Sequence, residues 1–284
     1  QSGENNYSVV LCKDKNGKKV IVKHLKYSND LLAAYQILNE GSMLKLFQNV
    51  ESKSGNNLVQ FPKLFEFKEE NGEILLSMEY VDGKLLKDYS PKRKLEILKA
   101  CISALMTASN HIDEKLKAKV PKRGVNFMSI TLPLYLIYAI KNTPGELALI
   151  LKMFLSYYYL LAINIFSEKN YILAHKCLHG ENVIVQNNKI VIIDPQLSVI
   201  AEKFSDLSIV SRMYFVTLGV NKIKNFLREF LKNKQDVQEY IRLSIFYSIQ
   251  TLAITSQKDH YHKESNRFLK ALDKHLMKEL LEIS

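Results

Sequence analysis

A short hairpin in the second half of the chain constrains the fold more than any other feature. Residues 183–193 read VIVQNNKIVII, two β-branched runs joined by a polar turn, which predicts two antiparallel strands. Asn182 stands directly before the first strand and Asp194 directly after the second. Because a hairpin brings its two ends together, we expect these side chains to lie side by side at one end of a sheet. An amide oxygen and a carboxylate suit a hard cation such as Mg²⁺, although both residue types are also common in turns.

The sequence pattern changes from strand-like to helix-like at Asp82 and Gly83. Upstream, β-branched and apolar runs predict strands, and one helix begins at Asn29 or Asp30. Downstream, apolar residues recur at helical spacing. We therefore predict an α+β fold of two lobes beside a cleft: residues 1–81, a small antiparallel sheet with one helix, and residues 82–284, a mainly helical lobe that holds the hairpin. Strands are expected over 7–13, 18–25 and 73–81, and helices over 31–47, 92–112, 147–166 and from 205 onward.

Charge and cysteine content limit the partners and the location. The 284 residues include 40 Lys and Arg against 29 Asp and Glu, a net charge of +11, which favours an anionic partner or substrate. A Lys- and Asn-rich genome composition explains the same charge equally well. Three scattered cysteines form neither a disulfide framework nor a zinc site, and the first residues, which begin at Gln1, carry no secretion-signal pattern. We expect a trimmed N-terminus and a cytoplasmic protein with reduced thiols.

Two apolar segments raise the question of a membrane. Residues 147–166 are long enough to span a bilayer, but Lys152 and Asn164 interrupt them, so we favour a buried core helix over a membrane span. Residues 127–140 are also apolar and contain Pro133. This second segment is interpreted as core, as the wall of a substrate site, or as a patch at a membrane surface with lysines flanking it.

The residues around the hairpin resemble a known catalytic site. His175, Cys177 and Asn182 stand in the spacing H-x-C-x-x-x-x-N, and the hairpin and Asp194 follow. This order resembles the catalytic loop and metal-binding aspartate of the protein-kinase-like superfamily. That superfamily also carries an upstream strand of the Val-Ala-Ile-Lys type, which residues 20–23 (VIVK) match. The resemblance implies a two-lobed protein-kinase-like fold, with an N-terminal sheet that lacks its first strand.

Two further segments match the superfamily, and the spacing indicates a branch within it. Glu40 stands on the helix that follows the VIVK strand, and residues 78–83 (MEYVDG) resemble the hinge between the lobes. Asp206 follows Asp194 by only 12 positions, which leaves no room for a long activation segment. The stretch from the hinge to His175 is longer than in a typical protein kinase. These features are similar to the aminoglycoside phosphotransferase and choline kinase branch.

The resemblance implies a role for each matching residue. Lys23 would hold the α- and β-phosphates of ATP, and Glu40 would orient Lys23. The backbone around Glu79 and Val81 would bind adenine.

In the catalytic loop and hairpin, the resemblance makes Asn182 and Asp194 the ligands of Mg²⁺. His175 would be a structural support, not a base. An aspartate in the position of Asp206 supports the catalytic loop in this branch.

The chain departs from the family at Cys177, where the family has the aspartate that accepts the proton of the attacking hydroxyl. A thiol has a pKa near ~8.5 and is a poor acceptor at neutral pH. Cys177 is native in a non-catalytic member, an engineered replacement of Asp, or native in an enzyme whose acceptor is His179 or Glu181. A buried core cysteine in a shifted alignment and a covalent nucleophile are weaker alternatives. Ser2 and Gly3 are all that matches the family's phosphate-covering loop.

The sequence thus favours an ATP- and Mg-dependent phosphotransferase, weakened or disabled by Cys177, that acts on a hydroxyl of a small molecule or carbohydrate. The main alternative is a nucleotide-binding pseudokinase that serves as an interaction or regulatory module. Contact with a membrane surface through residues 127–140 is a weaker interpretation. Nucleic-acid binding is disfavoured because the basic residues form no cluster with interleaved aromatics.

Overall fold

The chain folds into two compact units, each built from two stretches of sequence. The computed structural model describes residues 8–26, 30–54, 58–112, 114–118, 120–167, 169–276 and 278. Unit 1 comprises residues 1–121 and 175–200, and unit 2 comprises residues 122–174 and 201–284. The expected boundary between residues 81 and 82 falls inside unit 1, so the lobes 1–81 and 82–284 stay a prediction distinct from these units.

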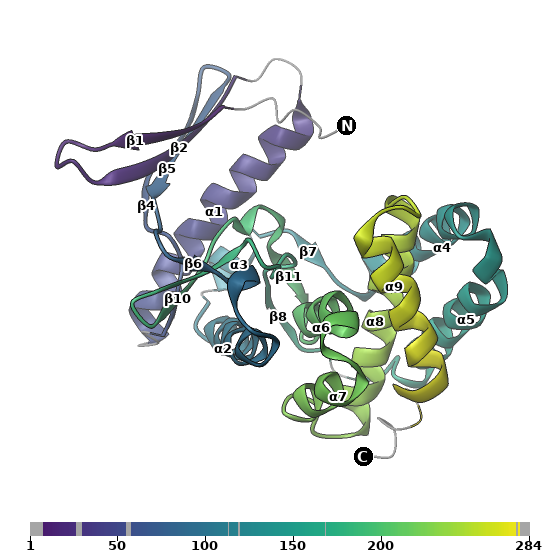
Figure 1. The fold of residues 1–284 in the computed structure, drawn as a ribbon. Helices are drawn as coiled ribbons and strands as arrows, with labels where there is room; N and C mark the ends of the chain where they lie inside the picture. The colour runs from purple at the N-terminus through teal and green to yellow at the C-terminus, as the bar shows by residue number, and fades with distance from the viewer. Residues whose placement is uncertain are drawn as a thin grey trace. The chain divides into compact units, whose positions relative to one another are not determined.

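A four-stranded antiparallel sheet forms one part of unit 1 (Figure 1). Its strands are β1 (Ser8–Lys13), β2 (Lys19–Lys26), β4 (Leu64–Glu70) and β5 (Glu73–Glu79), in the order β1-β2-β5-β4. Asp14 closes the β1–β2 turn, since its carboxylate accepts hydrogen bonds from the N–H groups of Asn16 and Lys18 at 2.8 Å, and Gly17 has a φ of 75°. The strands expected over 7–13, 18–25 and 73–81 are confirmed to within two residues at each end.

The helix α1 (Leu31–Ser54) packs against this sheet. The carboxylate of Asp30 caps it, accepting hydrogen bonds from the N–H groups of Leu32 at 3.0 Å and Ala33 at 2.9 Å. The side chains of Met43, Leu44 and Phe47 are fully buried. This helix extends beyond its expected end at residue 47.

The predicted hairpin is confirmed and lies in a second sheet of unit 1. Strands β9 (Val183–Gln186) and β10 (Lys189–Ile192) pair antiparallel, with Val183 opposite Ile192. Asn187 and Asn188 form the turn with φ values of 49° and 64°, a conformation that Asn tolerates better than most residues. The short strands β3 (Val59–Gln60) and β6 (Lys84–Leu85) complete the order β3-β10-β9-β6. Unit 1 also contains η1 (Leu86–Asp88), α2 (Pro91–Ser109), α3 (Glu114–Lys117) and η3 (Pro195–Leu197).

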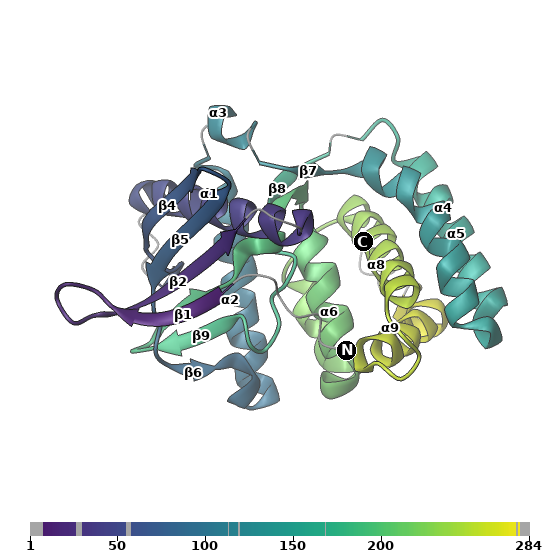
Figure 2. The ribbon, with the colours of Figure 1, turned by 90° about the horizontal axis from the view of Figure 1, so that it is seen from above.

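Unit 2 is mainly helical, and its helices pack around α8 (Lys234–Ile254) (Figure 2). Most α8 side chains are buried, because α4 (Val125–Asn142), α5 (Leu147–Ile163), α6 (Ser205–Leu218) and α9 (His260–Ala271) all contact this helix. A three-stranded sheet has the order β7-β11-β8. The remaining elements are β7 (Lys122–Arg123), η2 (Pro144–Glu146), β8 (Tyr171–Ala174), α7 (Val220–Arg228) and η4 (Leu272–Leu276), and the boundary between the units falls within β11 (Val199–Glu202).

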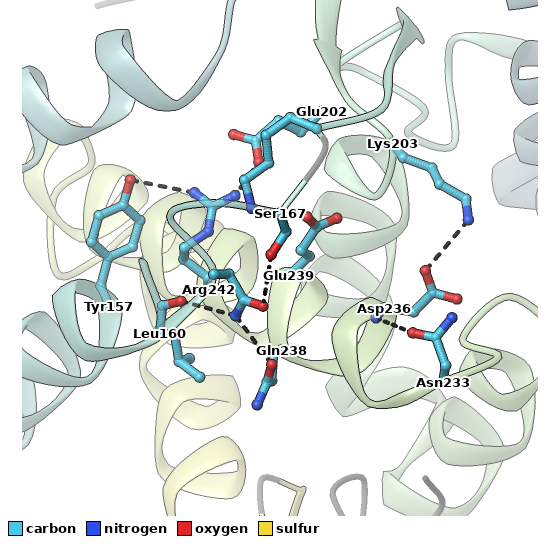
Figure 3. Close-up of polar contacts among 12 residues, drawn as sticks. Tyr157, Leu160, Ser167, Glu202, Lys203, Asn233, Asp236, Gln238, Glu239 and Arg242 are labelled. Carbon is cyan, nitrogen blue, oxygen red and sulfur yellow. Dashed lines mark hydrogen bonds and ion pairs between the residues drawn. The ribbon is translucent and has the colours of Figure 1, made fainter. Parts of the chain in front are cut away.

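A buried polar cluster links α8 to its neighbours in unit 2 (Figure 3). Arg242 of α8 forms an ion pair with Glu202, and both residues are about 1% exposed. Arg242 also donates a hydrogen bond to the Tyr157 hydroxyl of α5 at 3.5 Å. Nearby, Lys169 pairs with Glu239 at 3.0 Å. Burial of so many charges is tolerated only because each charge has a partner.

The helix α5 corrects one expectation from the sequence. Residues 147–166 were predicted as a buried core helix, yet only one side of α5 is buried, through Ile150, Met153, Tyr157 and Leu160. Among the described residues, one helical stretch, Pro144–Ile163, is long and apolar enough to cross a membrane, and 22% of its most apolar window is buried. The prediction of a helix buried in the core on all sides is therefore wrong, because the outer side chains of α5 are exposed.

Candidate functional site

Unit 1 contains a cavity of about 600 Å³ that brings most of the predicted site residues together. The hairpin, β2, α1 and the segment after β5 all contribute to its lining. Six of the eight predicted site residues line it: Lys23, Glu40, Glu79, Val81, Asn182 and Asp194. His175 and Cys177 do not appear in this lining.

A lysine lies between two carboxylates at one end of the cavity. The Nζ atom of Lys23 on β2 lies 2.7 Å from Oε2 of Glu40 on α1 and 3.3 Å from Oδ1 of Asp194 after β10. The side chain of Glu40 is 1% exposed, whereas that of Asp194 is 28% exposed. The buried carboxylate therefore holds the ammonium group in place, while the more open one remains accessible to a ligand.

Burial competes with the ion pair at Glu40. Burial raises the pKa of the Glu40 carboxyl to about 7, although the attraction of Lys23 opposes this rise. Asp194 adds to the rise because it is a second negative charge nearby. One cation thus serves two carboxylates, and a second cation at Asp194 would favour the ionised form of Glu40.

Asp194 has an unusual backbone conformation. Its φ and ψ of 58° and 57° lie in the left-handed region, which few residues other than Gly, Asn and Asp adopt. The Nε2 group of Gln196 donates a hydrogen bond to its Oδ2 atom at 3.1 Å. Such conformations persist where the surrounding structure fixes them, and they concentrate at functional sites.

Asn39 fixes the segment after Asp194, and the sequence did not reveal this role. Its Nδ2 group donates hydrogen bonds to the carbonyl oxygens of Gln196 at 2.8 Å and Ser198 at 3.0 Å. Asn39 is buried beside Glu40 in the middle of α1, where Asn is a poor helix former. The only sequence signal for this role is the occurrence of Asn in the middle of a predicted helix, because Asn is retained there mainly when its side chain makes a specific contact.

Asn182 presents its amide oxygen while its amide nitrogen is engaged. The Nδ2 group of Asn182 donates a hydrogen bond to the carbonyl of Cys177 at 3.1 Å. The backbone N–H of Ile193 donates to the Asn182 carbonyl at 2.9 Å, which ties both ends of the hairpin together. Asn182 and Asp194 thus offer hard oxygen donors to one cavity, which fits the ligand preference of Mg²⁺. The described residues hold no group of three or more His, Cys, Asp or Glu able to bind a metal, so a cation here needs further ligands from phosphates and water.

His175 is fully buried behind the hairpin. Its Nε2 atom lies 3.0 Å from the carbonyl oxygen of Ile193. Burial lowers the pKa of His175 to about 4, although Asp194 and the Ile193 carbonyl oppose this effect. The imidazole is therefore neutral at physiological pH, and its Nε2–H donates to the Ile193 carbonyl.

The neutral state of His175 predicts a pH dependence of stability. Its pKa of about 4 in the folded chain is below the ordinary 6.5, so the unfolded chain binds the proton more tightly. This contribution to the free energy of unfolding is complete above pH 6.5 and is lost as pH falls toward 4. In urea unfolding, the change in the free energy of unfolding from pH 7 to pH 4.5 should be about 2 to 3 kcal/mol more unfavourable for the parent than for His175→Gln. An equal pH dependence in this variant would contradict the assignment.

Cys177 lies in the loop before the hairpin and is partly buried. Lys176 before it has a φ of 69°, again in the left-handed region. Of the two alternative proton acceptors, Glu181 is exposed and pairs with Lys87 at 2.9 Å, and it does not line the cavity. Burial lowers the pKa of His179, whose Nδ1 atom accepts the N–H of Glu181 at 3.2 Å. His179 does not line the cavity either, and its Nδ1 lone pair is engaged by the Glu181 N–H, so the structure favours neither group as the proton acceptor.

The segment after β5 forms another edge of the cavity. The N–H of Glu79 donates to the carbonyl of Lys63 at 2.8 Å and is therefore engaged within the sheet. Within the described part of the chain, the N–H of Val81 has no hydrogen-bond partner. A Cβ atom on Gly83 would lie 2.6 Å from the Val185 carbonyl oxygen, so glycine allows this segment to approach β9. The apolar walls are formed by Val9, Ile21, Met78, Leu85, Ile184 and Ile193.

Two predicted features lie outside this geometry. Ser2 and Gly3, matched to the end of a phosphate-covering loop, lie outside the described residues. Asp206, matched to a support of the catalytic loop, is buried in the first turn of α6 in unit 2.

Comparisons with known proteins support the fold. The sequence matches no protein-family model and no curated protein. Among solved structures, the chain is similar to aminoglycoside 2′-phosphotransferase-IIIa bound to GDP, with a TM-score of 0.63, 13% identity, and coverage of 96% of this chain and 90% of that one. It is also similar to spectinomycin phosphotransferase bound to ADP and spectinomycin, with a TM-score of 0.59, 14% identity, and coverage of 95% and 86%. It is similar as well to an amicoumacin kinase bound to AMP-PNP and Ca²⁺, with a TM-score of 0.59, 14% identity, and coverage of 96% of this chain and 87% of that one. The predicted kinase-like α+β fold of the aminoglycoside phosphotransferase type is thereby confirmed.

Proposed function

We propose that this protein binds ATP with Mg²⁺ and transfers its terminal phosphoryl group to a hydroxyl of a small molecule or carbohydrate. One observation carries the proposal: the cavity of unit 1 holds the ion-paired Lys23, Glu40 and Asp194 together with Asn182. Phosphoryl transfer needs positioned cationic charge more than covalent chemistry from the protein. This cluster supplies a fixed cation beside two hard oxygen donors.

Each residue has a task in this proposal. Lys23 would bind the α- and β-phosphates, and the buried Glu40 would hold the ammonium group toward them. Asn182 and Asp194 would hold Mg²⁺, which neutralises the negative charge that develops during transfer. The Glu79 carbonyl and the Val81 N–H would pair with the adenine edge between the apolar walls of the cavity.

The acceptor is proposed from chemistry and from similar proteins. Two of the similar structures are phosphotransferases named for hydroxyl-bearing antibiotics, spectinomycin and aminoglycosides. The net charge of +11 favours an acceptor with anionic groups. With Cys177 in place of a carboxylate, we expect slow turnover at best, because the attacking hydroxyl lacks an efficient proton acceptor.

The test is magnesium-dependent nucleotide binding by Asp194→Asn. This variant should weaken Mg-ATP binding about tenfold or more, since it removes a ligand charge from the cation site. Calorimetry with ATP in Mg²⁺ and in EDTA should show that the parent depends on the metal and the variant does not. Asp88→Asn is the matched control, because Asp88 is exposed in the same unit. Equal Mg-ATP affinity of Asp194→Asn and the parent would sink the site assignment.

The pseudokinase alternative rests on Cys177 alone. It predicts nucleotide binding with no turnover, both in the parent and after Cys177 is replaced by Asp. Intact Lys23, Glu40, Asn182 and Asp194 in one cavity suit nucleotide binding in both functions, so turnover is the observation that separates them.

A further inference from the structure

The outer side of the α4–α5 hairpin in unit 2 is apolar and exposed. Among the described residues, 23 large hydrophobic side chains are exposed, and twelve of them lie between residues 127 and 166. Monomeric soluble proteins rarely expose a contiguous apolar patch beyond a few hundred Å². We call this surface the α4–α5 face and define it by Ile130, Leu134, Ile137, Leu151, Leu155 and Tyr159, which are 39–71% exposed.

Helical spacing gives each of the two helices an exposed apolar stripe along its length. On α4 the exposed residues recur at positions 130, 134 and 137, opposite the buried Met128 and Leu132. On α5 they recur at 151, 155 and 159, again opposite the side buried against α8. Figures 1 and 2 both draw α4 and α5 side by side at the outer edge of unit 2. Each helix is therefore apolar on two sides, of which the fold uses only one.

The charged side chains of the α4–α5 hairpin are almost all positive. Neither α4 nor α5 contains an acidic residue, and both carry an exposed lysine, Lys141 and Lys152. The one carboxylate between them, Glu146, forms an ion pair with Lys270 of α9. A partner for this hairpin must therefore be apolar where it meets the exposed apolar side chains and anionic where it meets the lysines. A partner surface that is acidic or polar throughout does not meet the first condition.

A row of basic side chains on α9 and its C-terminal extension borders this face. Lys263, Arg267, Lys270 and Lys274 recur at spacings of four, three and four residues and are all exposed, so they form one stripe. Among the described residues, three contacts hold α9 and its C-terminal extension beside α5 and the turn before it: Asn266 donates to Glu146 at 3.4 Å, Lys270 pairs with Glu146, and Lys152 pairs with Asp273 at 2.6 Å. Asn266, Lys270 and Asp273 therefore face the α4–α5 hairpin, and Lys263, Arg267 and Lys274 lie next to them on the exposed side.

We propose that unit 2 docks on an anionic lipid surface through the α4–α5 face, with the basic stripe of α9 at the headgroups. Apolar side chains beside a basic helix face are the arrangement with which interfacial proteins bind acidic membranes. Tyr159 adds an amphipathic ring of the kind enriched at the lipid–water boundary. A second copy of the chain is a poor occupant, because two positively charged faces would meet. This inference does not depend on the proposed phosphotransferase function.

The α4–α5 hairpin would lie on the membrane surface and would not span the membrane. The inner side of α5 is held to α8 by the buried Tyr157, which contacts Arg242, and by Asn164, which donates to Gln238 at 3.1 Å (Figure 3). A spanning α5 would break these contacts and leave Arg242 facing the space where Tyr157 was. Only the outer side chains therefore enter the lipid, to the depth of an interfacial helix.

The chain contains no tryptophan, which allows a direct test with a single reporter. Leu155→Trp on the full chain should show a blue shift of fluorescence on vesicles of phosphatidylcholine with 30% phosphatidylglycerol, and little shift on phosphatidylcholine alone. Phe65→Trp is the matched control, because Phe65 is 53% exposed on β4 of unit 1 and should show no shift. No shift for Leu155→Trp, or equal shifts for both reporters, would overturn the proposal.

Flotation with the same vesicles separates the apolar and the electrostatic contributions. Leu134→Ser with Leu155→Ser should lower vesicle binding about tenfold or more, and so should Lys263→Gln with Arg267→Gln. Lys222→Gln with Arg228→Gln on α7 removes the same charge elsewhere in unit 2 and should change binding little. An equal loss from this control would mean unspecific attraction. A parent that is dimeric by light scattering and stays off the vesicles would mean that a second copy covers the face. Thermal melting confirms that each variant folds, since all the altered side chains are at the surface.

Discussion

Cys177→Asp is expected to raise the rate of ATP hydrolysis by about 10²–10⁴-fold in the presence of Mg²⁺, the usual contribution of a general base. The hairpin, Asn182 and the ion-paired Lys23 are already in place, so the substitution supplies only the missing proton acceptor. Release of ADP without any acceptor molecule measures this rate, because water then replaces the unknown hydroxyl. Cys177→Asn is the control, since it has the size of Asp without its charge and should not raise the rate.

Equal rates for the parent and Cys177→Asp would mean that another group accepts the proton. His179 and Glu181 are the two candidates from the sequence, and His179 is tested first because it lies two residues from Cys177. In that case His179→Gln should remove the activity of the parent. Tight Mg-ATP binding without hydrolysis in every variant would instead support a nucleotide-binding regulatory protein.

Arg242→Met is expected to lower the free energy of unfolding by about 3–5 kcal/mol, the cost of leaving a buried charge without its partner. Glu202 is about 1% exposed and pairs with Arg242, so the variant leaves its carboxylate in the core (Figure 3). Burial raises the pKa of Glu202, so part of this loss should be recovered at low pH, where the carboxyl is neutral. Urea unfolding at pH 7.5 and pH 5 measures both effects.

A double variant distinguishes the lost pair from lost packing. Arg242→Met with Glu202→Leu removes both charges and should recover most of the stability, because a buried ion pair is close in free energy to a well-packed apolar pair. Lys203→Met should cost less than about 1 kcal/mol, since its side chain is 31% exposed and its pair with Asp236 spans 3.5 Å. A double variant as unstable as Arg242→Met would show that the guanidinium acts through packing and not through its charge.

The local elements of unit 1 were predictable because their signals are local. The turn at Asp14 and Gly17, the cap at Asp30 and the hairpin around Asn187 all follow from residues a few positions apart. The pairing of Lys23 with Asp194 joins residues 171 positions apart; the resemblance to a known catalytic site placed both in one nucleotide site but did not indicate that they pair. The contacts of Asn39 with Gln196 and Ser198 join residues 157 and 159 positions apart, and no motif marks them.

The environment of α5 was harder to predict, for a physical reason. An apolar run reveals that a helix avoids water, but not how many of its sides the fold covers. Only the position of α8 decides that Tyr157 is buried and Leu155 is exposed. The same limit applies to the division into units, which depends on contacts between distant segments and not on the change of character at Asp82.

The interleaving of the two units has a consequence for the order in which the chain matures. Lys23 and Glu40 leave the ribosome long before Asn182 and Asp194, with 53 residues of unit 2 between the two parts of unit 1. During synthesis the nascent sheet and α1 therefore wait with an incomplete cavity, and α1 lacks the segment that Asn39 binds. No contiguous fragment of the chain contains unit 1 alone, so a nucleotide-binding piece cannot be cut from this protein without carrying residues 122–174 along.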